Sequence, residues 1–244
     1  MADTPARSQP EVVIQGIKTM LTTGELKAGD RLPVENDLAA QLGVSRGSLR
    51  EGVRALAILG VLDTRQGDGT YVTSLDPSVL LSPIGLLADL QTEGSEAHLL
   101  DVRRILEAES AARAAQHLTP EALLALGRVL DSVDEMLAED ADLERFIETD
   151  AAFHRGIAQA SGNPALAALI DSLGGQTFRA RLWRAINDRG SLADTQQEHR
   201  AILAELIRGD PERARIRMSV HILGVEEFAV SHPPTPDDEA THSG

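Results

Sequence analysis

Four side chains in the C-terminal half of the chain have types and spacings that suit a divalent metal ion. Asp150 and His154 are one helical turn apart, so their side chains can converge. His199 and His221 fall among apolar residues at the three-and-four spacing of buried helix faces in two later segments. A carboxylate with three imidazoles suits zinc or nickel first, and also manganese or cobalt, with positions left for water or a ligand oxygen.

The same residues have other interpretations. A buried histidine is commonly a hydrogen-bonded core residue, and spacing in the sequence does not show that four side chains meet. Burying one polar group without a partner costs about 1 to 3 kcal/mol, so four of them on inward faces favour one shared partner. The metal could serve a metalloenzyme fused to another module, or it could be purely structural in a dimerisation domain. Because no motif such as His-Glu-x-x-His supplies a general base, we do not expect an enzyme.

A second group of residues, near the N-terminus, is typical of contact with DNA. In residues 42–54, Gly43 suits a tight turn, and Ser45 can cap a new helix by accepting a hydrogen bond from its free amides. Arg46 and Arg50 lie one turn apart at the start of that helix and project from one side. A turn followed by a helix that begins with arginines is the arrangement of a helix-turn-helix.

The flanking segments predict how this helix is held. An amphipathic helix ends near residue 21, a Gly/Pro-punctuated loop follows, and a short helix covers residues 35–42. After the arginine-bearing helix, β-prone runs at residues 60–65 and 70–73 flank a Gln-Gly-Asp-Gly segment, which predicts a hairpin. Three helices and a hairpin make a winged helix-turn-helix.

Residues 10–75 resemble the DNA-binding domain of the GntR family of bacterial transcription regulators. The resemblance rests on a Gly-x-Leu-x-x-Gly-x-x-Leu-Pro loop, on Gly-Val-Ser-Arg before the second arginine, and on the glycine-rich wing. The family works on double-stranded DNA, so the resemblance implies a homodimer on a palindromic operator, and we expect a repressor. We predict DNA contacts at eight positions: Arg31, Asn36, Ser45, Arg46, Ser48, Arg50, Gln66 and Gly67.

The sequence departs from the family pattern at four residues. Val34 replaces a serine that usually caps the short helix, and Asn36 replaces an arginine that commonly contacts DNA. Gly47 offers no side chain to a base, and Gly52 in a helix interior costs about 1 kcal/mol against alanine. We therefore expect an operator unlike the family's common ones.

Residues 95–230 resemble the FCD ligand-binding domain of the FadR subfamily. The matching phrases include Asp-Val-Arg-Arg-Ile-Leu-Glu at residues 101–107 and Ser-Gly-Asn-Pro at residues 161–164. The metal ligands of that subfamily match Asp150, His154, His199 and His221. An arginine matching Arg103 lines its effector cavity, so the resemblance implies a small organic acid as effector.

Several residues of this region have simpler alternatives. Arg103 can instead form a salt bridge with Glu107, one turn further along the same helix. Asn163 is interpreted as a helix cap before a proline, and His98 and His117 are expected to be solvated at helix ends.

The amino-acid composition limits which classes of protein and which kinds of site are possible. The chain has 244 residues, of which 42% are hydrophobic, and its net charge is −1 over residues 1–75 and −14 over residues 76–244. A net-acidic protein still binds DNA where its basic residues are grouped. The absence of cysteine excludes disulfides and thiolate metal sites. No stretch approaches the roughly 20 apolar residues of a membrane span, and the polar N-terminus lacks a signal-peptide core, so we expect a cytoplasmic protein without membrane contact.

We therefore expect a mostly α-helical protein in four parts. They are a winged helix-turn-helix over residues 10–75, a linker and connecting helix over 76–94, an all-α effector-binding and dimerisation domain over 95–230, and a disordered tail over 231–244. Periodicity and Gly/Pro punctuation place the helices of the later parts near residues 84–91, 95–117, 119–138, 142–161, 164–187, 191–208 and 211–230.

Overall fold

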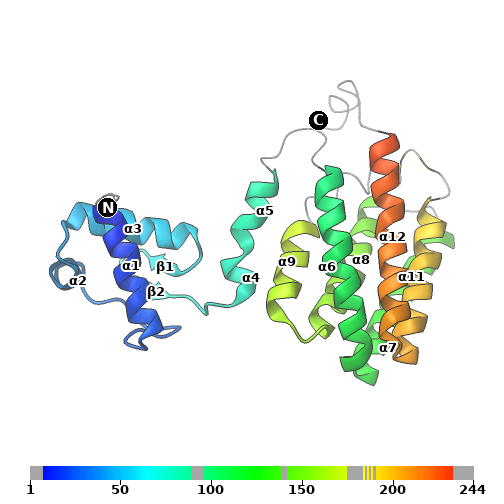
Figure 1. Ribbon diagram of the computed structural model, residues 1–244, viewed down its shortest axis with the longest axis horizontal. Helices are drawn as coiled ribbons and strands as arrows, with labels where there is room; N and C mark the ends of the chain where they lie inside the picture. Colours follow the sequence, from blue (N-terminus) through cyan, green and yellow to red (C-terminus); the bar gives the residue numbers. More distant parts are fainter. Residues whose placement is uncertain are drawn as a thin grey trace, which may run out of the picture. The chain divides into compact units, whose positions relative to one another are not determined.

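The protein is described by a computed structural model, in which two compact units divide after Pro83 (Figure 1). The structure describes residues 8–89, 96–138, 142–174, 184, 186, 188 and 191–232. As predicted, the fold is mostly helical, with one small antiparallel sheet in the first unit. The unit boundary falls inside the predicted linker. That linker is partly helical, since it contains α4 (Pro77–Leu80) and all of α5 (Ser82–Asp89).

The first unit is the predicted winged helix-turn-helix. Its elements are α1 (Gln9–Thr22), α2 (Glu35–Leu42), α3 (Arg46–Ile58), β1 (Leu62–Arg65) and β2 (Gly69–Val72). The three helices and the inner side of the hairpin enclose an apolar core that includes Val13, Ile17, Leu38, Leu49, Leu62 and Val72.

Local chemistry explains where the helices of this unit begin and end. The α2 helix has no side-chain cap at Val34, and it ends at Gly43, whose φ of 66° is left-handed. The chain then turns into α3, and the Ser45 hydroxyl accepts a hydrogen bond from the Ser48 amide at 3.1 Å. The predicted cap is therefore confirmed, and it orients the first turn of α3 away from the core.

Gly52 explains how closely α3 approaches α1. A Cβ atom on Gly52 would lie 2.6 Å from the Val13 side chain and 3.1 Å from the Pro10 carbonyl oxygen. The glycine that is unfavourable for an isolated helix thus permits the tight packing of the two helices.

The second unit is an all-α bundle. Besides most of α5, its described helices are α6 (Glu96–His117), α7 (Pro120–Ala138), α8 (Leu143–Ala160), α9 (Pro164–Gly174), α11 (Ser191–Arg208) and α12 (Pro211–Ser231). The α12 helix lies along α6, and α8 packs against α6 and α7 (Figure 1). The main core draws on α6, α7, α8, α11 and α12, with residues that include Ala111, Leu130, Phe153, Ile202, Leu206 and Met218.

The sequence predicted most of these boundaries to within two residues. Asn163 is the expected cap, because its side-chain oxygen accepts hydrogen bonds from the Ala165 and Leu166 amides at 3.1 and 3.2 Å. Of the helix predicted over residues 164–187, α9 covers Pro164–Gly174, and the described residues 184 and 186 are also helical. Helix α12 includes Ser231, which had been placed in the disordered tail, and residues 233–244 lie outside the described residues. Among the described helices, none is long and apolar enough to cross a membrane.

Candidate functional site

The four predicted metal ligands come together in the second unit. Asp150 and His154 extend from α8, His199 from α11 and His221 from α12, and all four are buried. Asp142 and Asp210 cap the N-termini of α8 and α12, because their side chains accept hydrogen bonds from the Arg145 and Arg213 amides. Because the four ligands lie on the apolar faces of their helices, packing of those faces buries them.

The ligand atoms are close enough to share one ion. Nε2 of His221 lies 3.2 Å from Nε2 of His154 and 3.3 Å from Nε2 of His199. Oδ1 of Asp150 lies 3.4 Å from Nε2 of His199. Four ligands placed tetrahedrally about 2.1 Å from a zinc ion would be about 3.4 Å apart. The spacing of the cluster therefore fits a transition-metal ion.

A buried charge pair orients His154. Nδ1 of His154 is hydrogen-bonded to Oε2 of Glu107, and Oε1 of the same carboxylate pairs with Nη2 of Arg103 at 2.6 Å. Burial by itself would raise the pKa of Glu107, but Arg103 and His154 hold that pKa well below its ordinary range. The carboxylate is thus ionised, and it fixes the His154 ring with Nε2 facing the other ligands.

His221 is held in the same way. Its Nδ1 lies 2.8 Å from Oε2 of Glu198, so both His154 and His221 have a carboxylate on Nδ1. A carboxylate only accepts hydrogen bonds, and therefore Nδ1 of each ring carries the proton. Burial lowers the pKa of His221, although Glu198 opposes this effect, so the ring stays neutral.

The Nε2 atoms of His154 and His221 face each other in an arrangement that suits a shared cation. With Nδ1 protonated and both rings neutral, the Nε2 atoms of His154 and His221 present facing lone pairs 3.2 Å apart. A metal ion between them would satisfy both lone pairs, and Asp150 and His199 would complete the set. The chemistry of the donor set therefore fits the group that the sequence predicted.

The structure pairs Arg103 with Glu107, the alternative that the sequence left open. Both side chains are 2% exposed, so Arg103 acts on the cluster through the carboxylate that orients His154. Sequence reasoning missed Glu107 and Glu198 as partners of the histidines. The only available signal was that metal-binding imidazoles commonly donate their second N–H to a carboxylate. His98 and His117 are exposed, as predicted.

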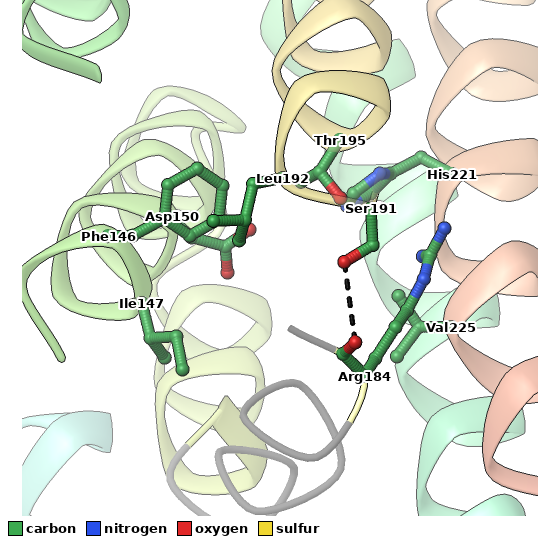
Figure 2. A pocket seen from close by; sticks show the side chains of 9 residues that line it. All are labelled: Phe146, Ile147, Asp150, Arg184, Ser191, Leu192, Thr195, His221 and Val225. Carbon is green, nitrogen blue, oxygen red and sulfur yellow. Dashed lines mark hydrogen bonds between the residues drawn. The ribbon is translucent and has the colours of Figure 1, made fainter. Parts of the chain in front are cut away.

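A cavity adjoins the cluster, as Figure 2 shows. Asp150 and Phe146 lie on one side of it, and His221, Val225 and Arg184 lie on the other. Its volume is about 20 Å³, which is room for roughly one water molecule.

The first unit presents the predicted DNA-contacting residues on α3. Arg46 and Arg50 have side chains 63% and 61% exposed, and both place Nε near Oε1 of Glu35, at 3.2 and 3.0 Å. Hydrogen bonds from Arg50 and Arg46 lower the pKa of Glu35. Such exposed ion pairs are weak in water, so a phosphate or a base edge can replace Glu35 as their partner.

The remaining predicted contacts lie around the same surface. Arg31 donates a hydrogen bond to the Asp68 carbonyl and so fastens the wing turn to the loop before α2. Asn36 is exposed on α2, and Gln66 and Gly67 are exposed at the wing tip. Ser45 and Ser48 are joined through their hydroxyls at 2.9 Å. A cleft of about 470 Å³, lined by α3, the wing strands and residues 31–35, separates these parts.

Comparison with known proteins agrees with both halves of this description. Residues 10–72 match the bacterial regulatory proteins of the gntR family, and residues 98–224 match the FCD domain. The HTH-type transcriptional regulator LutR of Bacillus subtilis is 32% identical over 213 residues, which cover 85% of this chain and 95% of LutR. The HTH-type transcriptional repressor NanR of Salmonella schwarzengrund is 28% identical over 220 residues, with 88% of this chain and 82% of NanR covered.

Solved structures support the same assignment. The structure of Streptococcus agalactiae GntR superimposes with a TM-score of 0.66 at 26% identity, covering 89% of this chain and 99% of that protein. The matched families and relatives are transcriptional regulators, so this chain is a regulator and not an enzyme. The chain belongs to the GntR family of bacterial regulatory proteins and carries an FCD domain after its winged helix-turn-helix.

Proposed function

We propose that this DNA-binding regulator is a repressor whose operator affinity is set by a small carboxylate effector, bound beside a divalent metal ion in the FCD domain. The observation that carries the metal is the pair of facing Nε2 atoms of His154 and His221, 3.2 Å apart, each ring with its Nδ1 committed to a carboxylate. Zinc and nickel suit this nitrogen-rich set first, and manganese and cobalt are compatible.

Charge supports an anionic effector. A divalent ion brings two positive charges and Asp150 one negative charge, while three neutral imidazoles add none. When bound, the ion would supply a positive field and positions open to an oxygen ligand. A small organic acid matches both features. A purely structural ion is the alternative, and it predicts that no acid changes operator affinity.

The DNA side of the proposal follows from the family assignment. A winged helix-turn-helix dimer places two recognition helices in successive major-groove half-sites, so we expect a homodimer on a palindromic operator, in the bacterial cytoplasm. The relative NanR is described as a repressor, which favours repression here. A tenfold change in operator affinity needs about 1.4 kcal/mol of coupling between effector and DNA.

The α3 surface provides the test of DNA binding. Arg50→Ala is expected to weaken binding to the native upstream region by about 1 to 3 kcal/mol, because it removes one arginine at the start of the recognition helix. Arg128→Ala, at an exposed position of α7, is the control and should bind as the wild type does. Gel-shift titrations measure both. An unchanged affinity of the Arg50 variant would show that α3 is not the recognition helix.

A further inference from the structure

Arg184 is a partly buried cation whose guanidinium is shielded from solvent at two of its three nitrogens. Its Nε and Nη1 atoms are shielded from solvent and have no hydrogen-bond partner in the part of the chain that the structure describes. A buried guanidinium is strongly disfavoured unless an anion or several acceptors pair with it. The N–H groups of these two nitrogens therefore suit an anionic ligand.

The position of Arg184 connects that place to the metal cluster. Arg184 lines the same cavity as Asp150 and His221, and its side chain extends toward His221 along α12 (Figure 2). A Cβ atom built on Gly224 of α12 would lie 3.7 Å from Nη1 of Arg184, which places the guanidinium against that helix. An anion bound to Arg184 would thus lie in the cavity beside the candidate metal ligands.

Arg103, the arginine expected from the sequence to bind the effector, is less suited to this task. Its guanidinium is committed to Glu107 through Nε at 2.7 Å and Nη2 at 2.6 Å. Capturing an effector with Arg103 would leave the buried Glu107 carboxylate with a weaker partner. Among the described residues, Nε and Nη1 of Arg184 have no hydrogen-bond partner to lose.

We propose that Arg184 binds the carboxylate of the effector through charge-assisted hydrogen bonds in the cavity beside the metal cluster. This inference rests on the proposed function, because it names the residue that recognises the acid. Apolar side chains of Phe146, Leu192 and Val225 form much of the remaining wall, so the rest of the ligand is a short chain rather than a second charged group.

The cavity also indicates what binding does to the fold. A volume of about 20 Å³ holds roughly one water molecule, so an organic acid must widen it. The Ser191 hydroxyl, at the start of α11, donates hydrogen bonds to the Asp188 and Arg184 carbonyl oxygens at 2.8 and 3.4 Å. Displacement of Arg184 would therefore also move the first turn of α11, the helix that contains His199.

The test uses full-length, zinc-loaded protein and calorimetric titration with acetate, L-lactate and succinate, each paired with its neutral amide. The wild type should bind at least one acid in preference to its amide. Arg184→Gln should weaken that acid at least tenfold, with the amide and the zinc content unchanged, because only the charge-assisted bonds are lost. Arg128→Gln, which changes an exposed arginine of α7, should bind as the wild type does.

Arg184→Lys keeps the charge but loses the planar pair of donors, so it should weaken the acid less than Arg184→Gln. If circular dichroism shows that Arg184→Gln is unfolded, the affinity of Arg184→Lys for the acid is the test of the role of Arg184. Wild-type affinity in the folded Arg184 variant would overturn the role of Arg184 and leave the proposed function intact. Failure of every acid to bind the zinc-loaded wild type would overturn both the acid effector and this inference.

Discussion

Removal of the metal is expected to destabilise the second unit by an amount that can be worked out. The four ligand atoms lie within 4.8 Å of one another and come from α8, α11 and α12, so one ion ties three helices together. An ion present at 100 to 1,000 times its Kd stabilises the folded state by about 2.7 to 4.1 kcal/mol. A unit of about 160 residues has an unfolding entropy near 0.34 kcal/mol/K, so chelation should lower its Tm by about 8 to 12 °C.

The His199→Ala variant distinguishes the contribution of the metal ion to the Tm from the contribution of side-chain packing. His199 contributes one ligand, and its ring also lies 4.7 Å from the ring of Phe153, so the variant loses packing as well as metal affinity. Its Tm should therefore be lower than that of the wild type before any chelator is added. The further fall on adding EDTA should be small, because little metal is left to remove.

Differential scanning calorimetry with and without EDTA measures both effects, and elemental analysis measures the bound metal. His98→Ala, at an exposed position of α6, is the matched control and should respond to EDTA as the wild type does. Equal EDTA shifts in the wild type and in His199→Ala, or protein purified without chelator that contains no transition metal, would refute the shared-ion reasoning.

Two further predictions concern packing and the support of the metal ligands. Gly52→Ala should lower the Tm of the first unit although alanine favours helices by about 1 kcal/mol, because the new Cβ would lie 2.6 Å from α1. Gly127→Ala on α7, where an added Cβ meets nothing within 4 Å, should be neutral or stabilising, and thermal melts compare the two. Glu107→Gln should reduce zinc affinity about 10- to 100-fold, since it weakens the bond that orients His154. A zinc-competition titration should find the affinity of Glu109→Gln, at a partly exposed position of the same helix, unchanged. Equal zinc affinities of the wild type and Glu107→Gln would contradict the role of Glu107.

The sequence alone determined the first unit almost completely. Its signals are local: Gly43 adopts the left-handed conformation that ends α2, and Ser45 caps α3 through an amide three residues away. The wing likewise follows from a glycine-rich turn between two short β-prone runs, paired in register from Leu62 with Val72 to Arg65 with Gly69. Interactions that span two to four residues are encoded in the spacing of residue types, so a pattern can predict them.

The sequence also identified which polar residues of the second unit face inward. Helical periodicity places Asp150 and His154 on the buried side of α8, and it does the same for His199 on α11 and His221 on α12. Periodicity assigns a face of a helix but not its neighbour. The resemblance to the FCD domain supplied the expectation that the four would meet, which spacing by itself left open.

Only the tertiary structure decided how these residues are supported and which arginine is available. Glu107 reaches His154 across 47 positions of the sequence, and Glu198 reaches His221 across 23, because separate helices pack side by side. The same packing commits Arg103 to Glu107, and within the described residues it leaves Nε and Nη1 of Arg184 without a hydrogen-bond partner. A salt bridge within one helix was visible in the sequence as a four-residue spacing. The absence of a partner depends on every side chain packed nearby, and it is therefore a property of the folded chain alone.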